Sequence, residues 1–297
     1  MRPTELIQVA AMLGVVIAIW WPIRVVIAQR MERAFERTHR RNADGVIIGA
    51  EPIHLRGVRS GAILLLHGYN DSPQAMAPLA SALHDAGWTV DVPLLPGHGR
   101  SLQEFERSGA RAWIDGASAA YRTLGTRHAD IAVCGMSMGG ALAFMLAAEH
   151  EAIRAVIGIA PYLHISWATE GLLSLSRVAV IGAKYVSRGG GRSLHDPVAA
   201  AKIIAYRAST PRLLRELARV TRAASDALPS VRQPVLVVQS RSDNRIPARS
   251  AARAFGRIGS SDKTIDWVTG AGHVLTLDYG HQAMEQRITA WLAARFV

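Results

Sequence analysis

The sequence predicts an α/β fold, in which a mostly parallel sheet carries helices on both faces. The main observation is that short apolar runs alternate with longer segments of helical composition through most of the 297 residues. A second observation is one interval without strand pattern, residues 162–233. A structureless loop of that length is rare in a compact domain. We therefore expect a helical cap or lid there, inserted into a core formed by residues 45–161 and 234–297.

The composition fits a folded globular protein. Apolar residues make up 49% of the chain and charged residues 19%, which excludes a disordered chain. The formal net charge is +11, but the basic residues are scattered arginines with three lysines. This usage is typical of a GC-rich genome, and no basic run with interleaved aromatic residues indicates nucleic-acid binding. The single cysteine, Cys134, falls in a predicted buried strand and is expected to be a small core residue.

The first 30 residues form a hydrophobic segment that differs from the rest of the chain. Residues 6–21 are apolar except for Gln8, and such a helix spans only about 24 Å of a ~30 Å hydrocarbon core. The segment reaches membrane length if residues 22–28 are added, with Arg24 extending towards the interface and Trp20 and Trp21 lying there.

Arginines cluster on the carboxyl side of this segment, in a polar linker of residues 31–44. By the positive-inside rule, we expect a single membrane-anchoring helix followed by a membrane-associated, cytoplasmic domain. Two alternatives stay open. Residues 26–28 (Val-Ile-Ala) are similar to a signal-peptidase site, which would give a secreted or periplasmic protein. The segment could also be a helix that covers the domain or mediates dimerisation.

The core elements follow in order. Residues 62–66 form a continuous apolar run, typical of a strand buried on both faces. Ser72 and Pro73 are a capping residue and a first-turn proline, so a helix begins there and ends near Gly87. By similar patterns we expect strands at 45–53, 88–92, 131–134, 154–160, 235–239 and 264–269. Further helices are expected at 111–128, 140–149 and 278–294.

Residues 135–139 read Gly-Met-Ser-Met-Gly, a G-x-S-x-G motif between a predicted strand and a predicted helix. In that setting the motif forms a nucleophile elbow, a turn so sharp that glycine is needed on both sides of the serine. Ser137 is thereby exposed as a candidate nucleophile. The backbone N–H of Met138 begins the helix, where negative charge is stabilised, and is a candidate oxyanion donor.

A serine nucleophile needs a histidine base, and the base should follow the insertion in the chain. Only His273 and His281 do so. His273 lies in a glycine-containing loop directly after a predicted strand, which allows its ring to approach Ser137. His281 lies within the closing helix and is expected at the surface. We therefore predict His273 as the base.

An acidic residue must hold the histidine in the correct tautomer. Asp243 follows the strand at 235–239, at the carboxyl edge where parallel sheets place their functional groups. Asp266 lies within a strand, and Asp262 lies before it, at the wrong end of the sheet. Asp278 has the position of a helix cap. We therefore predict Asp243 as the acid.

A second oxyanion donor should come from the loop after the strand that ends at His67 and Gly68. The backbone N–H of Tyr69 is the candidate, and its ring could line an acyl pocket. His67 and His98 are expected to fix loops by hydrogen bonding. The remaining histidines show no metal-like spacing, so we expect no catalytic metal and no cofactor.

These motifs together resemble the α/β-hydrolase superfamily from about residue 46 onwards. Residues 64–69 (Leu-Leu-Leu-His-Gly-Tyr), 95–99 (Leu-Pro-Gly-His-Gly) and 135–140 are similar to its bacterial carboxylesterase and monoacylglycerol lipase branch. Residues 273–278 are similar to the catalytic-histidine segment of that branch. The resemblance implies ester hydrolysis through an acyl-enzyme, with Ser137, Asp243 and His273 as the triad.

The predicted function is therefore that of a serine esterase or lipase. A lipid-like small-molecule ester, such as a monoacylglycerol or a lysolipid, is the expected substrate. Acyl transfer, thioester hydrolysis or amide hydrolysis use the same triad and remain open. A binding module without activity is disfavoured because such proteins usually lose a triad member.

Overall fold

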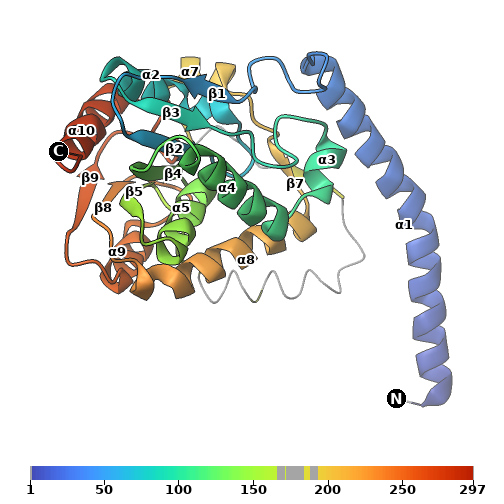
Figure 1. Cartoon of the computed structure of the whole chain (residues 1–297). Helices are drawn as coiled ribbons and strands as arrows, with labels where there is room; N and C mark the ends of the chain where they lie inside the picture. The colour runs from blue at the N-terminus through green and yellow to red at the C-terminus, as the bar shows by residue number, and fades with distance from the viewer. Residues whose placement is uncertain (1, 166–170, 172–183, 188–192, 297) are drawn as a thin grey trace.

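The computed structural model describes residues 2–165, 171, 184–187 and 193–296. Within them, seven strands form one sheet in the order β1-β3-β2-β4-β5-β8-β9. Only β1 is antiparallel to its neighbour; the other neighbours are parallel. The predicted α/β fold is confirmed (Figure 1). The strands are β1 (Ile53–Leu55), β2 (Ala62–Leu66), β3 (Thr89–Val92), β4 (Ile131–Met136), β5 (Ile153–Ile159), β8 (Val235–Ser240) and β9 (Lys263–Val268).

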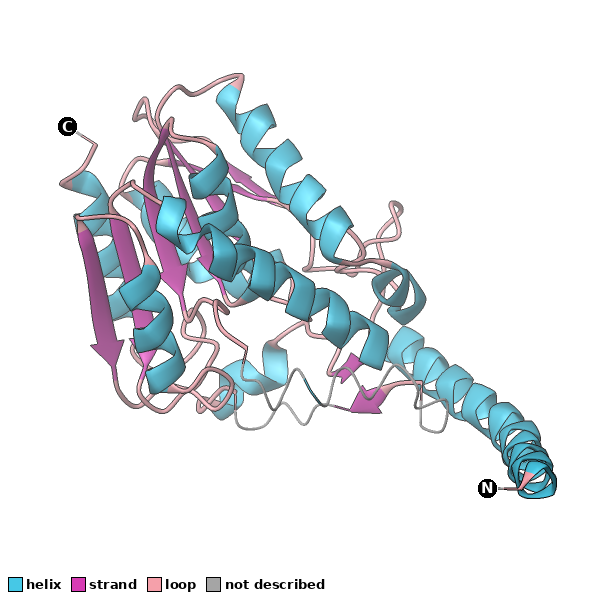
Figure 2. Ribbon diagram, turned by 90° about the horizontal axis from the view of Figure 1, so that it is seen from below, coloured by secondary structure: helices cyan, strands magenta, loops and turns pink. Residues whose placement is uncertain are grey.

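Helices cover both faces of this sheet (Figures 1 and 2). One face carries α4 (Ala110–Gly125), α5 (Met138–Glu149) and α8 (Pro211–Ala227), and the other carries α2 (Ala77–Asp85) and α10 (His281–Ala293). The remaining elements are η1 (Pro73–Met76), α3 (Leu102–Arg107), α7 (Pro197–Lys202), η3 (Leu228–Ser230) and α9 (Ala248–Arg257).

The apolar run in β2 explains why both faces are covered. Successive side chains of a strand point to opposite faces, so Leu64 and Leu66 join the core under α5, while Ile63 and Leu65 join the core under α2. All four side chains are fully buried. Two apolar faces require two helical layers, because neither face is stable in contact with water.

The predicted strand at residues 45–53 is wrong over most of its length. Only Ile53 belongs to a strand, β1, and residues 45–52 form turns with a single bridge between Arg41 and Ile47. The reason is local: Gly45 and Gly49 have φ angles of +74° and +92°. This left-handed conformation suits glycine and interrupts an extended chain.

The interval 162–233 contains more than helices. Two short strands, β6 (Val186–Ser187) and β7 (Ala208–Ser209), pair in an antiparallel ribbon, which the apolar pattern does not predict because each strand has only two residues. The long helix α8 packs along α5 and α4, with Leu213 and Val220 fully buried. Parts of the interval lie outside the described residues.

The N-terminal segment forms α1 (Pro3–Thr38), one helix of 36 residues that crosses the expected boundary at residue 30 without a break. Its first half extends away from the domain (Figure 1). Its second half packs on the domain through buried Phe35, whose ring stacks on Tyr206 at 5.2 Å between centroids. Glu32 accepts hydrogen bonds from Tyr185 (2.7 Å), Gln103 (2.9 Å) and Lys184 (3.0 Å).

The prediction of a transmembrane anchor is therefore corrected. Of the helices in the described part of the chain, none has both the length and the apolar character needed to cross a bilayer. The uninterrupted apolar run is about 24 Å long, short of the ~30 Å core, and Pro22 and Arg24 follow it. The expected membrane partner and membrane-associated location relied on that anchor and are not supported by a spanning helix in the described residues. The contacts of Phe35 and Glu32 lie in the predicted linker, and the apolar side chains of Met12, Val15 and Ile19 are exposed, so the alternative of a hydrophobic segment that covers the domain is not supported by them.

Candidate active site

The turn between β4 and α5 has the geometry of a nucleophile elbow. Ser137 adopts φ +54° and ψ −114°, a strained conformation for a residue with a side chain. The flanking glycines are required because a side chain at either position would clash with the backbone. A Cβ on Gly135 would lie 2.1 Å from the carbonyl oxygen of Gly139, and a Cβ on Gly139 would lie 2.0 Å from that of Leu66. The G-x-S-x-G spacing is thus a packing requirement at the carboxyl edge of the sheet.

The three residues predicted as a triad come together in the structure. Nε2 of His273 lies 3.0 Å from Oγ of Ser137, and Nδ1 of His273 lies 2.9 Å from Oδ2 of Asp243. The tautomer with hydrogen on Nδ1 satisfies both contacts, because Nδ1–H then donates to Asp243 and Nε2 accepts from the Ser137 hydroxyl. Asp243 lies after β8 and His273 after β9, so adjacent parallel strands deliver acid and base to the same edge.

Asp243 is held as a carboxylate by its surroundings. Its Oδ1 accepts the backbone amides of Arg245 (2.7 Å) and Ile246 (2.9 Å), and its Oδ2 also accepts from Nε2 of Gln239 (2.9 Å). Burial alone would raise the pKa of Asp243, but the hydrogen bonds from His273 and the two amides lower it below its ordinary value. The side chain therefore stays charged and oriented towards His273.

The two predicted oxyanion donors lie on segments that meet at the nucleophile. Met138 is the first residue of α5, so its N–H has no acceptor within the helix. Tyr69 follows Gly68, and a Cβ on Gly68 would lie 3.5 Å from Cβ of Ser137. The loop after β2 therefore runs directly beside the elbow. The Tyr69 ring lines the adjoining cavity, and its hydroxyl is hydrogen bonded to Ser209 of β7.

Two histidines have the loop-fixing contacts expected of them. His67 is fully buried, accepts the amide of Leu95 at Nε2 (3.1 Å) and has Nδ1 3.0 Å from the carbonyl oxygen of Gly68. Burial lowers the pKa of His67 to about 4. His98 is equally buried, with Nδ1 3.3 Å from the carbonyl oxygen of Pro96. Both rings are neutral parts of the scaffold at neutral pH.

Asp278 has a role that its position in the sequence does not suggest. It does not cap α10, which begins at His281 after Gly280. Instead its buried carboxylate accepts backbone amides from Gly272, His195 and Asp196. Burial alone would raise the pKa of Asp278, but these hydrogen bonds lower it. Asp278 therefore joins the loop that carries His273 to the start of α7. Asp278 lies two residues before Gly280, the residue that caps α10. An acidic residue that close to a helix start, but not at its cap position, was the one sign in the sequence of a different role.

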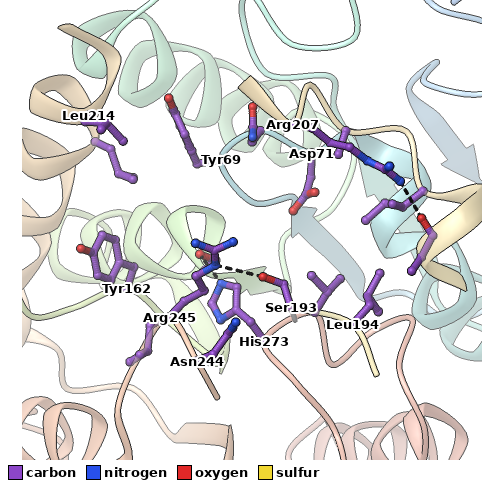
Figure 3. Close-up of a pocket in the computed structure, with 18 of the residues that line it drawn as sticks. Tyr69, Asp71, Tyr162, Ser193, Leu194, Arg207, Leu214, Asn244, Arg245 and His273 are labelled. Carbon is purple, nitrogen blue, oxygen red and sulfur yellow. Dashed lines mark hydrogen bonds between the residues drawn. The ribbon is translucent and has the colours of Figure 1, made fainter. Parts of the chain in front are cut away.

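A cavity of about 430 Å³ opens above Ser137, a volume typical of small-molecule sites. Figure 3 shows side chains from the loop after β2, from the 193–207 region and from α8 around it, with His273 on its floor. One part of the wall is apolar and is formed by Leu194, Ile203, Leu214, Leu217, Ala218 and Val274. Another part is polar and is formed by Asn70, Asp71, Ser193, Arg207, Asn244 and Arg245.

The described residues contain no group of three or more histidine, cysteine, aspartate or glutamate side chains arranged to hold a metal ion. The chemistry that the arrangement supports is nucleophilic. A serine hydroxyl contacts a neutral imidazole, the imidazole contacts a carboxylate, and helix and loop amides lie nearby for developing negative charge.

Comparisons with known proteins agree with this geometry. A family model described as serine aminopeptidase, S33 (Hydrolase_4) matches residues 57–279. A thermostable monoacylglycerol lipase from Bacillus sp. (strain H-257) is 31% identical over 248 residues, which cover 84% of this chain and 96% of the relative. A carboxylesterase from Bacillus subtilis (strain 168) is 26% identical over 250 residues, which cover 83% of this chain and 97% of the relative.

Solved structures are similar over the same region. One from work on the metagenome-derived lipolytic enzymes LipS and LipT has a TM-score of 0.77 and 29% identity, covering 84% of this chain and 99% of that one. The monoacylglycerol lipase of Paleococcus ferrophilus has a TM-score of 0.71 and 21% identity, covering 82% and 98%. The chain therefore belongs to the S33 family of serine hydrolases with the α/β-hydrolase fold, in the branch of the monoacylglycerol lipases and carboxylesterases.

Proposed function

We propose that this protein is a carboxylic-ester hydrolase that acts through Ser137, His273 and Asp243. The observation that carries the proposal is the continuous contact from the Ser137 hydroxyl through the His273 ring to the Asp243 carboxylate. This arrangement takes a proton from the nucleophile as it attacks an ester carbonyl and returns it to the leaving alcohol. The acyl group is then carried on Ser137 until water releases it.

In the first step His273 removes the Ser137 proton through Nε2, and Asp243 stabilises the resulting imidazolium through the hydrogen bond at Nδ1. The tetrahedral intermediate carries a negative oxygen, which the backbone amides of Met138 and Tyr69 bind. His273 then protonates the leaving alcohol, and the C–O bond breaks. Water repeats the sequence on the acyl-enzyme and regenerates Ser137.

The proposed substrates are lipid-like esters with medium acyl chains, monoacylglycerols first and lysolipids second. Two observations support this choice. The cavity beside Ser137 has an apolar wall of aliphatic side chains, suited to an acyl chain. In addition, the relative with 31% identity is a monoacylglycerol lipase. The polar wall faces the same space and suits the alcohol portion of the ester.

The test uses the full chain and three variants. A fluorophosphonate probe should label wild type and not Ser137→Ala. Hydrolysis of p-nitrophenyl octanoate should fall to background in Ser137→Ala and by about 10³–10⁴-fold in Asp243→Asn, which leaves the imidazole in the wrong tautomer. Asp85→Asn, a change at a side chain that is 76% exposed, is the matched control and should keep full activity. Folded Ser137→Ala protein that retains wild-type turnover would refute the proposal.

Product analysis separates hydrolysis from acyl transfer. With octanoylglycerol as donor, the proposal expects free octanoic acid as the main product even when short alcohols are added. A product dominated by new esters would assign the same triad to a transferase.

A further inference from the structure

The ribbon formed by β6 and β7 contacts the loop that carries a predicted oxyanion donor. We call this loop, residues 68–71, the oxyanion loop, because it contains Tyr69. The hydroxyl of Ser209, in β7, is hydrogen bonded to the Tyr69 hydroxyl. The backbone amide of Tyr206, two residues before β7, donates to the carbonyl oxygen of Asn70 (3.1 Å). The ribbon therefore holds both a side chain and the backbone of the oxyanion loop.

The same ribbon is fixed by α1, near the start of each of its strands. Figure 2 shows the two short strands beside the half of α1 that packs on the domain. Tyr185, directly before β6, is buried and donates from its hydroxyl to Glu32 (2.7 Å). The buried ring of Tyr206 stacks on Phe35, with 5.2 Å between centroids and 24° between planes. Glu32 and Phe35 are three residues apart and share one face of the helix, so one face of α1 holds both strands.

Backbone strain next to Tyr206 is a second observation that the ribbon is held in place by its surroundings. Arg207 adopts φ +51°, in the left-handed region that residues with a side chain rarely enter. Such a conformation persists only where neighbouring contacts fix it. The ring of Tyr206 supplies them, because it stacks on Phe35 and on Phe105. Loss of the packing on α1 should let the chain relax at Arg207 and move the Tyr206 amide away from Asn70.

The position of the Tyr69 amide affects the rate more than it affects substrate binding. An oxyanion donor acts at about 2.7–3.1 Å from the negative oxygen, so a small displacement of the loop weakens this hydrogen bond. The charge on that oxygen develops only as the tetrahedral intermediate forms. Contacts that hold the loop therefore stabilise the transition state and contribute little to the affinity for the ester.

We propose that Glu32 and Phe35 of α1 are positioning residues of the active site, which hold the oxyanion loop in its catalytic position through the β6–β7 ribbon. The inference rests on the proposed ester hydrolysis, since the oxyanion loop serves that reaction. It adds the N-terminal helix to the catalytic unit, although α1 precedes residues 57–279, the segment that the family model matches.

The experiment measures turnover per active site in the full chain. Exhaustive labelling with a fluorophosphonate counts the folded sites, so loss of folded protein is not mistaken for slower chemistry. Glu32→Ala should lower kcat for p-nitrophenyl octanoate by about fivefold to twentyfold, less than the 10²–10³-fold cost of removing a whole donor. KM should change by less than about twofold. Glu32→Gln keeps an oxygen that accepts from Tyr185 and should restore most of kcat. Glu36→Ala, one turn along α1, removes an exposed ion pair with Arg41 and is the matched control.

Two further variants test the route through the ribbon. Ser209→Ala removes the hydroxyl that contacts Tyr69. In that background Glu32→Ala should reduce kcat less than it does in wild type, because part of the route is already interrupted. Phe35→Leu keeps an apolar side chain but loses the stack on Tyr206. It should lower kcat with little change in KM, and it replaces Glu32→Ala if that protein does not fold.

Three outcomes would overturn the positioning role. They are equal kcat per labelled site in Glu32→Ala and Glu36→Ala, a loss confined to KM, and an equal effect of Glu32→Ala in wild type and in Ser209→Ala. Wild type that is not labelled and does not hydrolyse the ester would instead refute the proposed function.

Discussion

Asp278 holds together two segments that lie beside the cavity above Ser137. Its fully buried carboxylate accepts the backbone amides of Gly272 (2.6 Å), His195 (2.9 Å), Asp196 (2.9 Å) and Tyr279 (2.9 Å). Gly272 precedes the predicted base, and residues 195–196 lie directly before α7, beside the cavity. Loss of this acceptor should therefore affect both stability and activity, although Asp278 does not contact the cavity.

The perturbation is Asp278→Asn, which keeps the shape but replaces one acceptor oxygen by a donor. A hydrogen bond to a charged acceptor contributes about 1.5–3 kcal/mol. The new nitrogen leaves Gly272 without an acceptor if it takes the position of Oδ2, and Asp196 and Tyr279 if it takes that of Oδ1, since His195 lies near both oxygens. Local relaxation recovers part of the loss. We expect the free energy of unfolding to fall by about 3 kcal/mol. For a domain of this size the corresponding fall in Tm is about 6–12 °C.

The assay pairs thermal unfolding with turnover of p-nitrophenyl octanoate below the new Tm. A displaced loop misplaces the imidazole of His273, so kcat should fall about tenfold to a hundredfold with a smaller change in KM. Asp85→Asn is the exposed control and should match wild type in both measurements. The reasoning would be refuted by a variant whose Tm lies within about 2 °C of wild type and whose kcat is unchanged.

Two further predictions concern α1 and the buried histidines. Glu32→Ala removes three hydrogen bonds between α1 and its neighbours and should lower Tm by about 2–4 °C, for a loss of about 1 kcal/mol. Glu36→Ala, on the same helix with only an exposed ion pair to Arg41, should change Tm less; equal effects would contradict the docking role of Glu32. The second prediction is pH-dependent. The pKa of His67 is about 4 in the folded protein, against 6.5 for the ordinary side chain, so the unfolded state binds the proton more tightly. The contribution of His67 to the free energy of unfolding is complete above pH 6.5. It is lost as the pH falls towards 4, and the total loss is about 3 kcal/mol. The raised pKa of Asp71 makes stability increase on acidification over the same range, so the effect of His67 is isolated by comparison with a variant. The test measures Tm at pH 7.5 and at pH 4.5 in wild type and in His67→Gln. The variant should lose less stability on acidification, and parallel curves would contradict the assignment.

Much of the arrangement follows from local patterns in the chain. The alternation of apolar runs and helical segments predicts the sheet, and the glycines around Ser137 predict the elbow because no other residue fits there. His273 and Asp243 follow from their positions directly after strands, since the carboxyl ends of parallel strands meet at one edge. Each of these inferences depends on a few neighbouring residues and on a general rule of sheet geometry.

Other features were not predicted, the first for a local reason and the rest because they depend on contacts between distant segments. Residues 45–53 look extended by composition, yet Gly45 and Gly49 turn the chain. The membrane anchor was inferred from hydropathy, interfacial tryptophans and the arginines that follow, and these patterns do not register that the second half of α1 packs on the domain through Phe35. Asp278 has the position of a helix cap, but its partners lie up to 83 residues away in the chain.

The sequence by itself determined the fold class, and it placed the elbow serine, the histidine and the aspartate at one edge of the sheet, because strand period, turn sterics and strand-end placement act over short stretches of chain. The tertiary structure alone decided which side chains share the cavity. The carboxyl group of Asp71 faces Ser137 and His273 because the loop after β2 folds back against the elbow at Gly68. The proximity of these side chains depends on the path of the whole chain, so no local sequence pattern predicts it.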